Sequence, residues 1–146
     1  MTTENFIISD ISMEGFQVVR SQYFCRQIEP CMTIWDKRIA FNLPAYAALN
    51  NCEAVQFFVN KDDRKILVKP APTKETDSVN WIRNPKAPKQ TRLECSLFTA
   101  QLFDAWEWDS DMRYRAYGKL VSFDRKVMLL FNFSQPEKWK GMRLVK

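Results

Sequence analysis

Apolar and polar residues alternate in several short stretches of the first half of the chain, a pattern typical of β-strands with one buried face. Strands are expected at residues 15–24, 32–41, 53–60 and 65–70. The second of these strands is expected to bend or turn at Asp36 and Lys37. Between the strands, Asn42 can cap a short helix whose first turn tolerates Pro44. The first half therefore predicts the order strand, short helix, strand, strand.

The second half repeats this order of elements. Strands are expected at residues 91–96, 112–123 and 127–133, with a helix over 97–108. The sequence Asp-Arg-Lys occurs at 63–65 and again at 124–126, 61 positions later and at the same point of the element order. We interpret this correspondence as an internal duplication.

Each repeated unit is small for a stable core of its own, whereas two units with interleaved strands would cover each other's edges. We therefore predict a mainly β fold with short helices (α+β), built from two strand-helix-strand-strand units that interleave in one pseudo-symmetric barrel. The first unit is expected at residues 15–70 and the second at 92–136, with a Pro-rich basic linker at 71–91 and a basic C-terminal tail at 137–146. Together they are expected to form one folded body.

The linker carries a ladder of cations at every third position. Its members are Arg83, Lys86, Lys89 and Arg92. Pro85 and Pro88 lie between them and exclude an α-helix, whereas a polyproline II segment would align the four cations along one edge about 9 Å apart. Two interpretations stay open: a row of cations that faces phosphates, or a stiff and soluble linker. Trp81 and Ile82 interrupt the polar linker, so we expect this point to dock on the folded body.

Charge and composition limit the chemistry of the chain. The net charge is +5, and the ladder contributes four cations to it, so the basic character is local. The chain has no histidine and only three glycines, which excludes Ser-His-Asp and Cys-His catalysis and glycine-rich phosphate loops. Its four cysteines lack the close pairs of zinc sites. We expect neither an enzyme nor a metal or other cofactor.

The localisation is expected to be cytoplasmic, with no membrane partner. No apolar run approaches the length of a membrane span, and the first ten residues lack the pattern of a signal peptide. Free thiols in a reducing compartment agree with this expectation.

Residues 32–71 resemble the AbrB/SpoVT swapped-hairpin family of bacterial DNA-binding modules. The matching positions are Asp36, Lys37, Arg38 and Ile39 in the turn and second strand, Pro44 and Leu49 in the helix, and Ile66, Leu67, Val68, Lys69 and Pro70 in the last strand. The likeness covers about forty residues with short motifs, and two copies in one chain are similar to the MraZ proteins of this group. The resemblance implies a swapped-hairpin barrel that grips a duplex through basic residues near its strand turns, among them Lys37 and Arg38.

Together, the ladder and the resemblance predict a small regulator from a bacterium or a mobile element that binds duplex rather than single-stranded DNA through phosphate contacts. The candidate DNA-binding residues are Lys37, Arg38, Arg64, Lys65, Arg83, Lys86, Lys89, Arg92, Arg113, Arg115, Lys119, Arg125 and Lys126. Each also has a second interpretation as a solvated turn, linker or surface charge. Trp106 and Trp108 are interpreted as core residues rather than as platforms for bases. The alternative function is a protein-interaction adaptor on the same fold, and a homo-oligomer is an open possibility.

Overall fold

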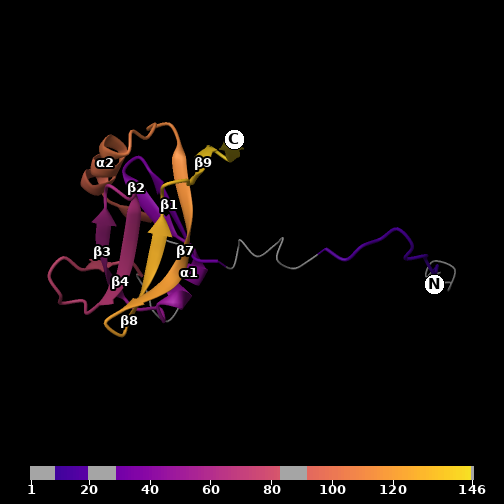
Figure 1. Ribbon diagram of the computed structural model, residues 1–146, viewed down its shortest axis with the longest axis horizontal. Helices are drawn as coiled ribbons and strands as arrows, with labels where there is room; N and C mark the ends of the chain where they lie inside the picture. Colours follow the sequence, from indigo (N-terminus) through magenta and orange to yellow (C-terminus); the bar gives the residue numbers. More distant parts are fainter. Residues whose placement is uncertain (1–8, 20–28, 83–91, 146) are drawn as a thin grey trace, which may run out of the picture.

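A curled antiparallel sheet forms a half-barrel, accompanied by two short helices (Figure 1). The computed structural model describes residues 9–19, 29–82 and 92–145. The strands are β1 (Cys31–Trp35), β2 (Arg38–Phe41), β3 (Ala54–Asn60), β4 (Lys65–Ala71), β5 (Val79–Asn80), β6 (Arg92–Glu94), β7 (Arg113–Phe123), β8 (Lys126–Asn132), β9 (Glu137–Lys140) and β10 (Arg143–Val145). The helices are α1 (Leu43–Ala48) and α2 (Ser96–Ala105), at opposite ends of the sheet. The expected mainly β architecture with short helices is confirmed.

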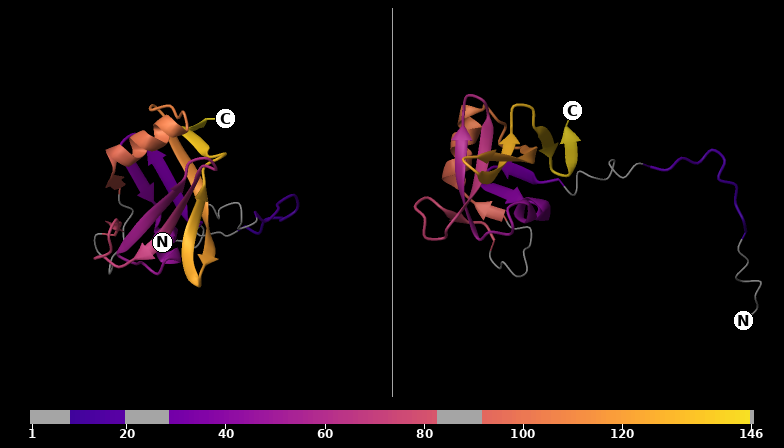
Figure 2. Two further views of the ribbon diagram at one scale, coloured as in Figure 1. Left: turned by 60° about the vertical axis from the view of Figure 1, so that its left-hand side comes forward. Right: turned by 60° about the horizontal axis from the view of Figure 1, so that its bottom comes forward.

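Strands from the two halves of the chain alternate in groups across the sheet. The order is β5-β3-β4-β8-β7-β1-β2-β6, and β9 extends the pairing of β7. Two strands of the second half, β8 and β7, therefore lie between β4 and β1 of the first half. Val68 of β4 is paired with Leu129 of β8, and Ile34 of β1 is paired with Tyr114 of β7. Figure 2 shows the resulting curl from two further sides.

Local sequence signals explain the elements of the first half. The turn predicted at Asp36 and Lys37 separates β1 from β2, and Lys37 takes the left-handed conformation at φ 72°. The side chain of Asn42 accepts a hydrogen bond from the backbone N–H of Ala45 at 3.1 Å, and Pro44 lies in the first turn of α1, where its missing N–H costs nothing. The predicted cap and turn are both confirmed.

One core fills the inside of the curl. Trp81 lies at its centre with 1% of its surface exposed, and its ring packs edge-on against Tyr46 and Phe41 at centroid distances of 4.7 and 5.0 Å. Its indole N–H donates to the carbonyl of Cys52 at 2.6 Å. Trp106, only 2% exposed, packs beside Phe133 at the end of the core covered by α2. The expected docking of Trp81 and the expected burial of Trp106 are confirmed.

Three segments differ from the sequence-based expectations. Residues 15–19 form no strand, because they extend from the body without a neighbouring strand to pair with, and residues 20–24 lie outside the described part. The expected linker contains β5, which pairs with β3, before it enters the core at Trp81. The expected C-terminal tail contains the β9–β10 hairpin, whose first strand pairs with β7.

Gly118 permits the close packing of β7 over the core. A Cβ at this position would lie 2.6 Å from Cε1 of Phe131, whose ring is fully buried. The same glycine donates its backbone N–H to the carbonyl of Pro30 at 2.8 Å, where the chain enters β1. The neighbouring ring and strand therefore leave no room for a side chain.

We expect Gly118→Ala to lower the free energy of unfolding by about 1–3 kcal/mol, the usual cost of overpacking a core. Urea denaturation of the variant and the parent measures this change. Gly141→Ala is a poor control because Gly141 has φ 62°, so Ser122→Ala on the exposed part of the same strand serves instead. A stability loss no larger than that of Ser122→Ala would contradict the close contact.

Candidate nucleic-acid interface

Four arginines and two tryptophans share the outer face of the sheet formed by β6, β2, β1, β7 and β9. We call this surface the basic-aromatic face; its members are Arg38, Arg92, Arg113, Arg115, Trp35 and Trp139. The strand registers bring them together from distant parts of the sequence. Across one row, Arg92 is opposite Ala40, Ala40 is opposite Thr33, and Thr33 is opposite Arg115.

Strand alternation explains why these arginines point outward. Successive side chains of a strand lie on opposite faces. Tyr114 and Ala116 of β7 are buried on the core side, with 3% and 5% of their surfaces exposed, so Arg113 and Arg115 lie on the other side. The sequence-based expectation that these arginines share one strand face with Lys119 agrees with this alternation.

Two of the arginines stack on the two tryptophans. The guanidinium carbon of Arg92 lies 5.5 Å from the ring centroid of Trp35, and that of Arg115 lies 5.0 Å from the ring centroid of Trp139. Each distance is within the range of a cation–π interaction. A stacked guanidinium keeps its N–H edge available for a carboxylate or phosphate. The tryptophans therefore hold two cations in place on this face, while both rings stay partly exposed.

Hydrogen bonds fix the β7 arginines further. Arg115 donates through Nε to Oγ1 of Thr33 at 3.0 Å, and Arg113 donates to the carbonyl of Gly141 in the β9–β10 turn. Glu137 accepts from the hydroxyl of Tyr117 at 3.2 Å and from the indole of Trp139 at 3.3 Å. These bonds attach the β9–β10 hairpin to β7 and reduce the side-chain entropy that a bound ligand would otherwise have to remove.

One pair of opposite charges lies at the rim of this face. Arg38 is opposite Glu94 in the β2–β6 ladder, and their charged atoms are 3.3 Å apart. Both side chains are exposed, at 42% and 77%, so the pair adds little to stability. The four arginines face two carboxylates on these strands, Glu94 and Glu137, which leaves the face with a surplus of positive charge.

The other described candidate residues lie on turns and on the neighbouring sheet face. Lys37 is in the β1–β2 turn, where its backbone N–H donates to Oγ1 of Thr99 and its carbonyl accepts from Cys95. Lys65 and Lys126 lie on β4 and β8, away from the basic-aromatic face, and Arg125 lies in the β7–β8 turn. Lys119 lies on the same side of β7 as Arg113 and Arg115, but farther along the strand, where β7 pairs with β8. The structure thus brings four candidate residues together, with Lys119 farther along the same strand face, and separates the other four.

Arg64 lines a polar cavity of about 520 Å³ near the end of the sheet covered by α2. Lys138 contributes a second cation and Glu107 an acid to the same lining. Trp108 and Tyr114 form part of the wall, with their rings stacked at 4.1 Å and inclined by 7°. Its two cations make this cavity a second candidate binding site for an anionic group.

Arg83, Lys86 and Lys89 of the ladder lie outside the described residues. The fourth member, Arg92, begins β6 and belongs to the basic-aromatic face. Sequence reasoning missed Trp35 and Trp139. A tryptophan at an outward strand position beside an arginine on a partner strand is the signal for such a residue, and the strand register is needed to recognise it.

Burial raises the pKa of the thiols of Cys31 and Cys52, and it raises the pKa of Cys95 from its ordinary value of 9.0 to about 11. In the described ranges, no group of three cysteine or acidic side chains could hold a metal ion. No helix in the described part of the chain is long and apolar enough to cross a membrane.

The raised pKa of Cys95 predicts slow alkylation at neutral pH, because the thiolate is the reactive form. We expect its rate with iodoacetamide to rise about tenfold per pH unit and to level off only near pH 11. A folded-state pKa above the unfolded one also means that Cys95 stabilises the fold below pH 9, and that this contribution is lost as the pH rises through about 11. Peptide mapping of alkylated protein measures the rate; a rate that levels off near pH 9 would contradict the buried environment.

Comparisons with models of protein families, with characterised proteins and with solved structures found no match to this chain. The function has to be argued from the site itself.

Proposed function

We propose that this chain is a small DNA-binding protein, a transcription regulator of bacterial or mobile-element type, that grips duplex phosphates with its basic-aromatic face. The observation that carries the proposal is the stacking of Arg92 on Trp35 and of Arg115 on Trp139. The stacking holds two guanidinium groups on the outer face of the sheet, and a stacked guanidinium can still donate to phosphate oxygens. In the sequence, the three other cations of the ladder precede Arg92, and we expect them to add phosphate contacts.

A duplex is favoured over a single strand by the same geometry. Proteins that bind single strands stack bases on exposed aromatic rings. Here a guanidinium lies over each of Trp35 and Trp139 and competes with a base for stacking on that ring. Positive charge at fixed spacing remains, and it recognises phosphates without reading their sequence.

The proposed fold behind this function is a pseudo-symmetric, swapped-hairpin-like barrel of AbrB type, made of two interleaved units. Its support comes from strand pairings that correspond between the halves. β2 pairs with β6, which holds the same place in the second unit, and β4 pairs with β8 in the same way. The pairing of β1 with β7 corresponds to the pairing of β5 with β3. Val68 and Leu129 are direct partners, and they are 61 positions apart, like the two Asp-Arg-Lys turns. Units related in this way would place two sets of basic turns around one axis.

The first test is binding of a labelled duplex to the full chain at several salt concentrations. Each neutralised phosphate changes the slope of log affinity against log salt by about −0.9. Contacts from the face and the ladder therefore predict a slope of about −3 or steeper. A single strand of the same length should bind more weakly at each salt concentration. Absence of binding at low salt, or a flat slope, would favour the adaptor function instead.

A further inference from the structure

A shallow apolar hollow lies on the outer face of β3, β4, β8 and the second half of β7. It has a volume of about 470 Å³. Its lining comprises Phe58, Leu67, Lys69, Val121, Ser122, Phe123, Asp124, Lys126 and Met128. The strand registers assemble it, because Phe58 is opposite Leu67 and Val121 is opposite Met128. This surface is separate from the basic-aromatic face.

The hollow exposes large aromatic side chains to solvent. Phe123 is 75% exposed and Phe58 is 46% exposed, although both lie on regular strands. A contiguous apolar surface of this kind on a soluble domain usually marks a contact site.

Lysines surround the apolar floor. Lys69 and Lys126 line the hollow, and Lys65 and Lys119 occupy outward positions of the same sheet face. Of the described residues that line the hollow, Asp124 is the only acid. Like charges would repel two such faces placed against each other, so the surface favours an occupant that is apolar and acidic.

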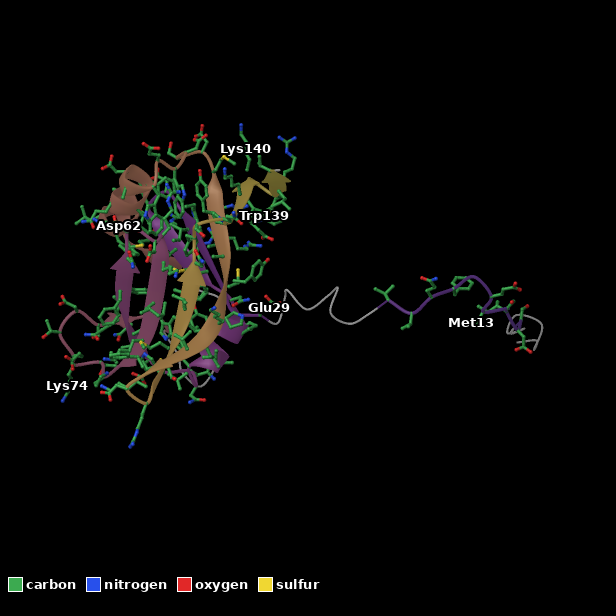
Figure 3. All side chains as sticks on the ribbon, in the orientation of Figure 1. Met13, Glu29, Asp62, Lys74, Trp139 and Lys140 are labelled. Carbon is green, nitrogen blue, oxygen red and sulfur yellow. The ribbon has the colours of Figure 1, made fainter. Side chains whose placement is uncertain are left out.

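The N-terminal arm, residues 9–19, has these two properties. Ile11 and Met13 alternate with polar residues and are 72% and 69% exposed, and Phe16 follows at 68%. Asp10 and Glu14 are its charged residues, and the arm has no cation. It extends away from the body of its own chain (Figure 3), so its apolar side chains and the hollow are exposed at the same time.

We propose that the N-terminal arm of one copy of this chain docks in the apolar hollow of a second copy, and that the exchange is reciprocal. In an extended arm, Ile11 and Met13 lie on one side and contact Phe58 and Phe123 of the other copy. Asp10 and Glu14 flank this apolar pair, Glu14 in the turn that precedes Phe16, and bring negative charge toward the lysines of the rim. Each chain supplies one arm and one hollow, so in a symmetric dimer of two copies both hollows are occupied and both arms are docked.

Sedimentation of the full chain over a concentration series tests the exchange. The parent is expected to form a dimer. Ile11→Ser with Met13→Ser, or Phe123→Ser alone, should weaken dimerisation by about tenfold or more, because each removes buried apolar surface. All three side chains are exposed in the single chain, so these changes leave the fold intact, and circular dichroism checks this. Val127→Ser is the matched control, since Val127 is 48% exposed on the same hairpin but does not line the hollow.

A mixing experiment separates exchange from folding back within one chain. The arm variant retains an intact hollow, and the Phe123→Ser variant retains an intact arm. Each alone should be monomeric at concentrations where the parent is a dimer, and together they should form a one-to-one heterodimer. The proposal is overturned if the parent stays monomeric over the concentration series, or if the mixture gives no heterodimer. It is also overturned if the arm variant still forms a dimer, because the arm would then not be what the hollow binds.

Discussion

Residues 1–82, expressed without the rest of the chain, are expected to show no cooperative unfolding transition as a monomer. The fragment contains the β1–β2 and β3–β4 hairpins, which, among the described strands, are joined in the sheet through β7 and β8. Without those two strands, one edge of β1 and one edge of β4 lose their hydrogen-bonding partners. An isolated two-stranded hairpin is marginally stable in water, so the fragment should unfold, aggregate or pair with a second copy.

Circular dichroism in a urea series, combined with sedimentation, measures this outcome. The complementary test mixes residues 1–82 with residues 83–146, which should restore a cooperative transition because the missing strands return. A soluble monomeric fragment that unfolds cooperatively by itself would show that the halves are separate domains, contrary to the interleaved sheet.

Trp81→Ala is expected to lower the free energy of unfolding by about 3–5 kcal/mol, the usual range for removing a large buried aromatic side chain. Trp81 is 1% exposed, packs against Tyr46 and Phe41, and donates to the carbonyl of Cys52. The substitution would leave a cavity at the centre of the core and a carbonyl without this donor. A loss of this size is a large part of the stability of a domain of this length.

Val79→Ala is the control for that variant, because Val79 belongs to the same segment but is 37% exposed. We expect it to change the stability much less. Thermal or urea denaturation of both variants beside the parent gives the comparison. Equal effects of the two substitutions would mean that the segment around β5 is not anchored by Trp81.

Local signals in the sequence were sufficient for most elements of the fold. The alternation of β3 and β4, the turn at Lys37 and the cap at Asn42 each depend on neighbouring residues, and the structure contains all of them. Residues 15–19 have a strand-like composition but form no strand, because a strand also needs a partner that composition does not specify.

The candidate site was harder to predict from the sequence than the elements of the fold were. The alternation of Arg113 and Arg115 indicated one strand face, but the neighbours of that face come from β1 and β9. Trp35 and Trp139 are 104 positions apart in the chain, and only the strand register brings both beside arginines. Long-range register is set by the whole core, which a single sequence does not reveal residue by residue.

The most direct measurement of the central claim is the salt dependence of duplex binding for Arg92→Gln/Arg115→Gln beside two matched variants. If both guanidiniums contact phosphates, the double glutamine variant should reduce the slope of log affinity against log salt by about 1.8, which is two contacts at about 0.9 each. Arg92→Lys/Arg115→Lys keeps both charges and should retain most of the slope. Lys61→Gln/Lys74→Gln removes two cations from loops outside the basic-aromatic face and should leave the slope unchanged. A glutamine variant that is folded and keeps the slope of the parent would contradict phosphate binding by this face.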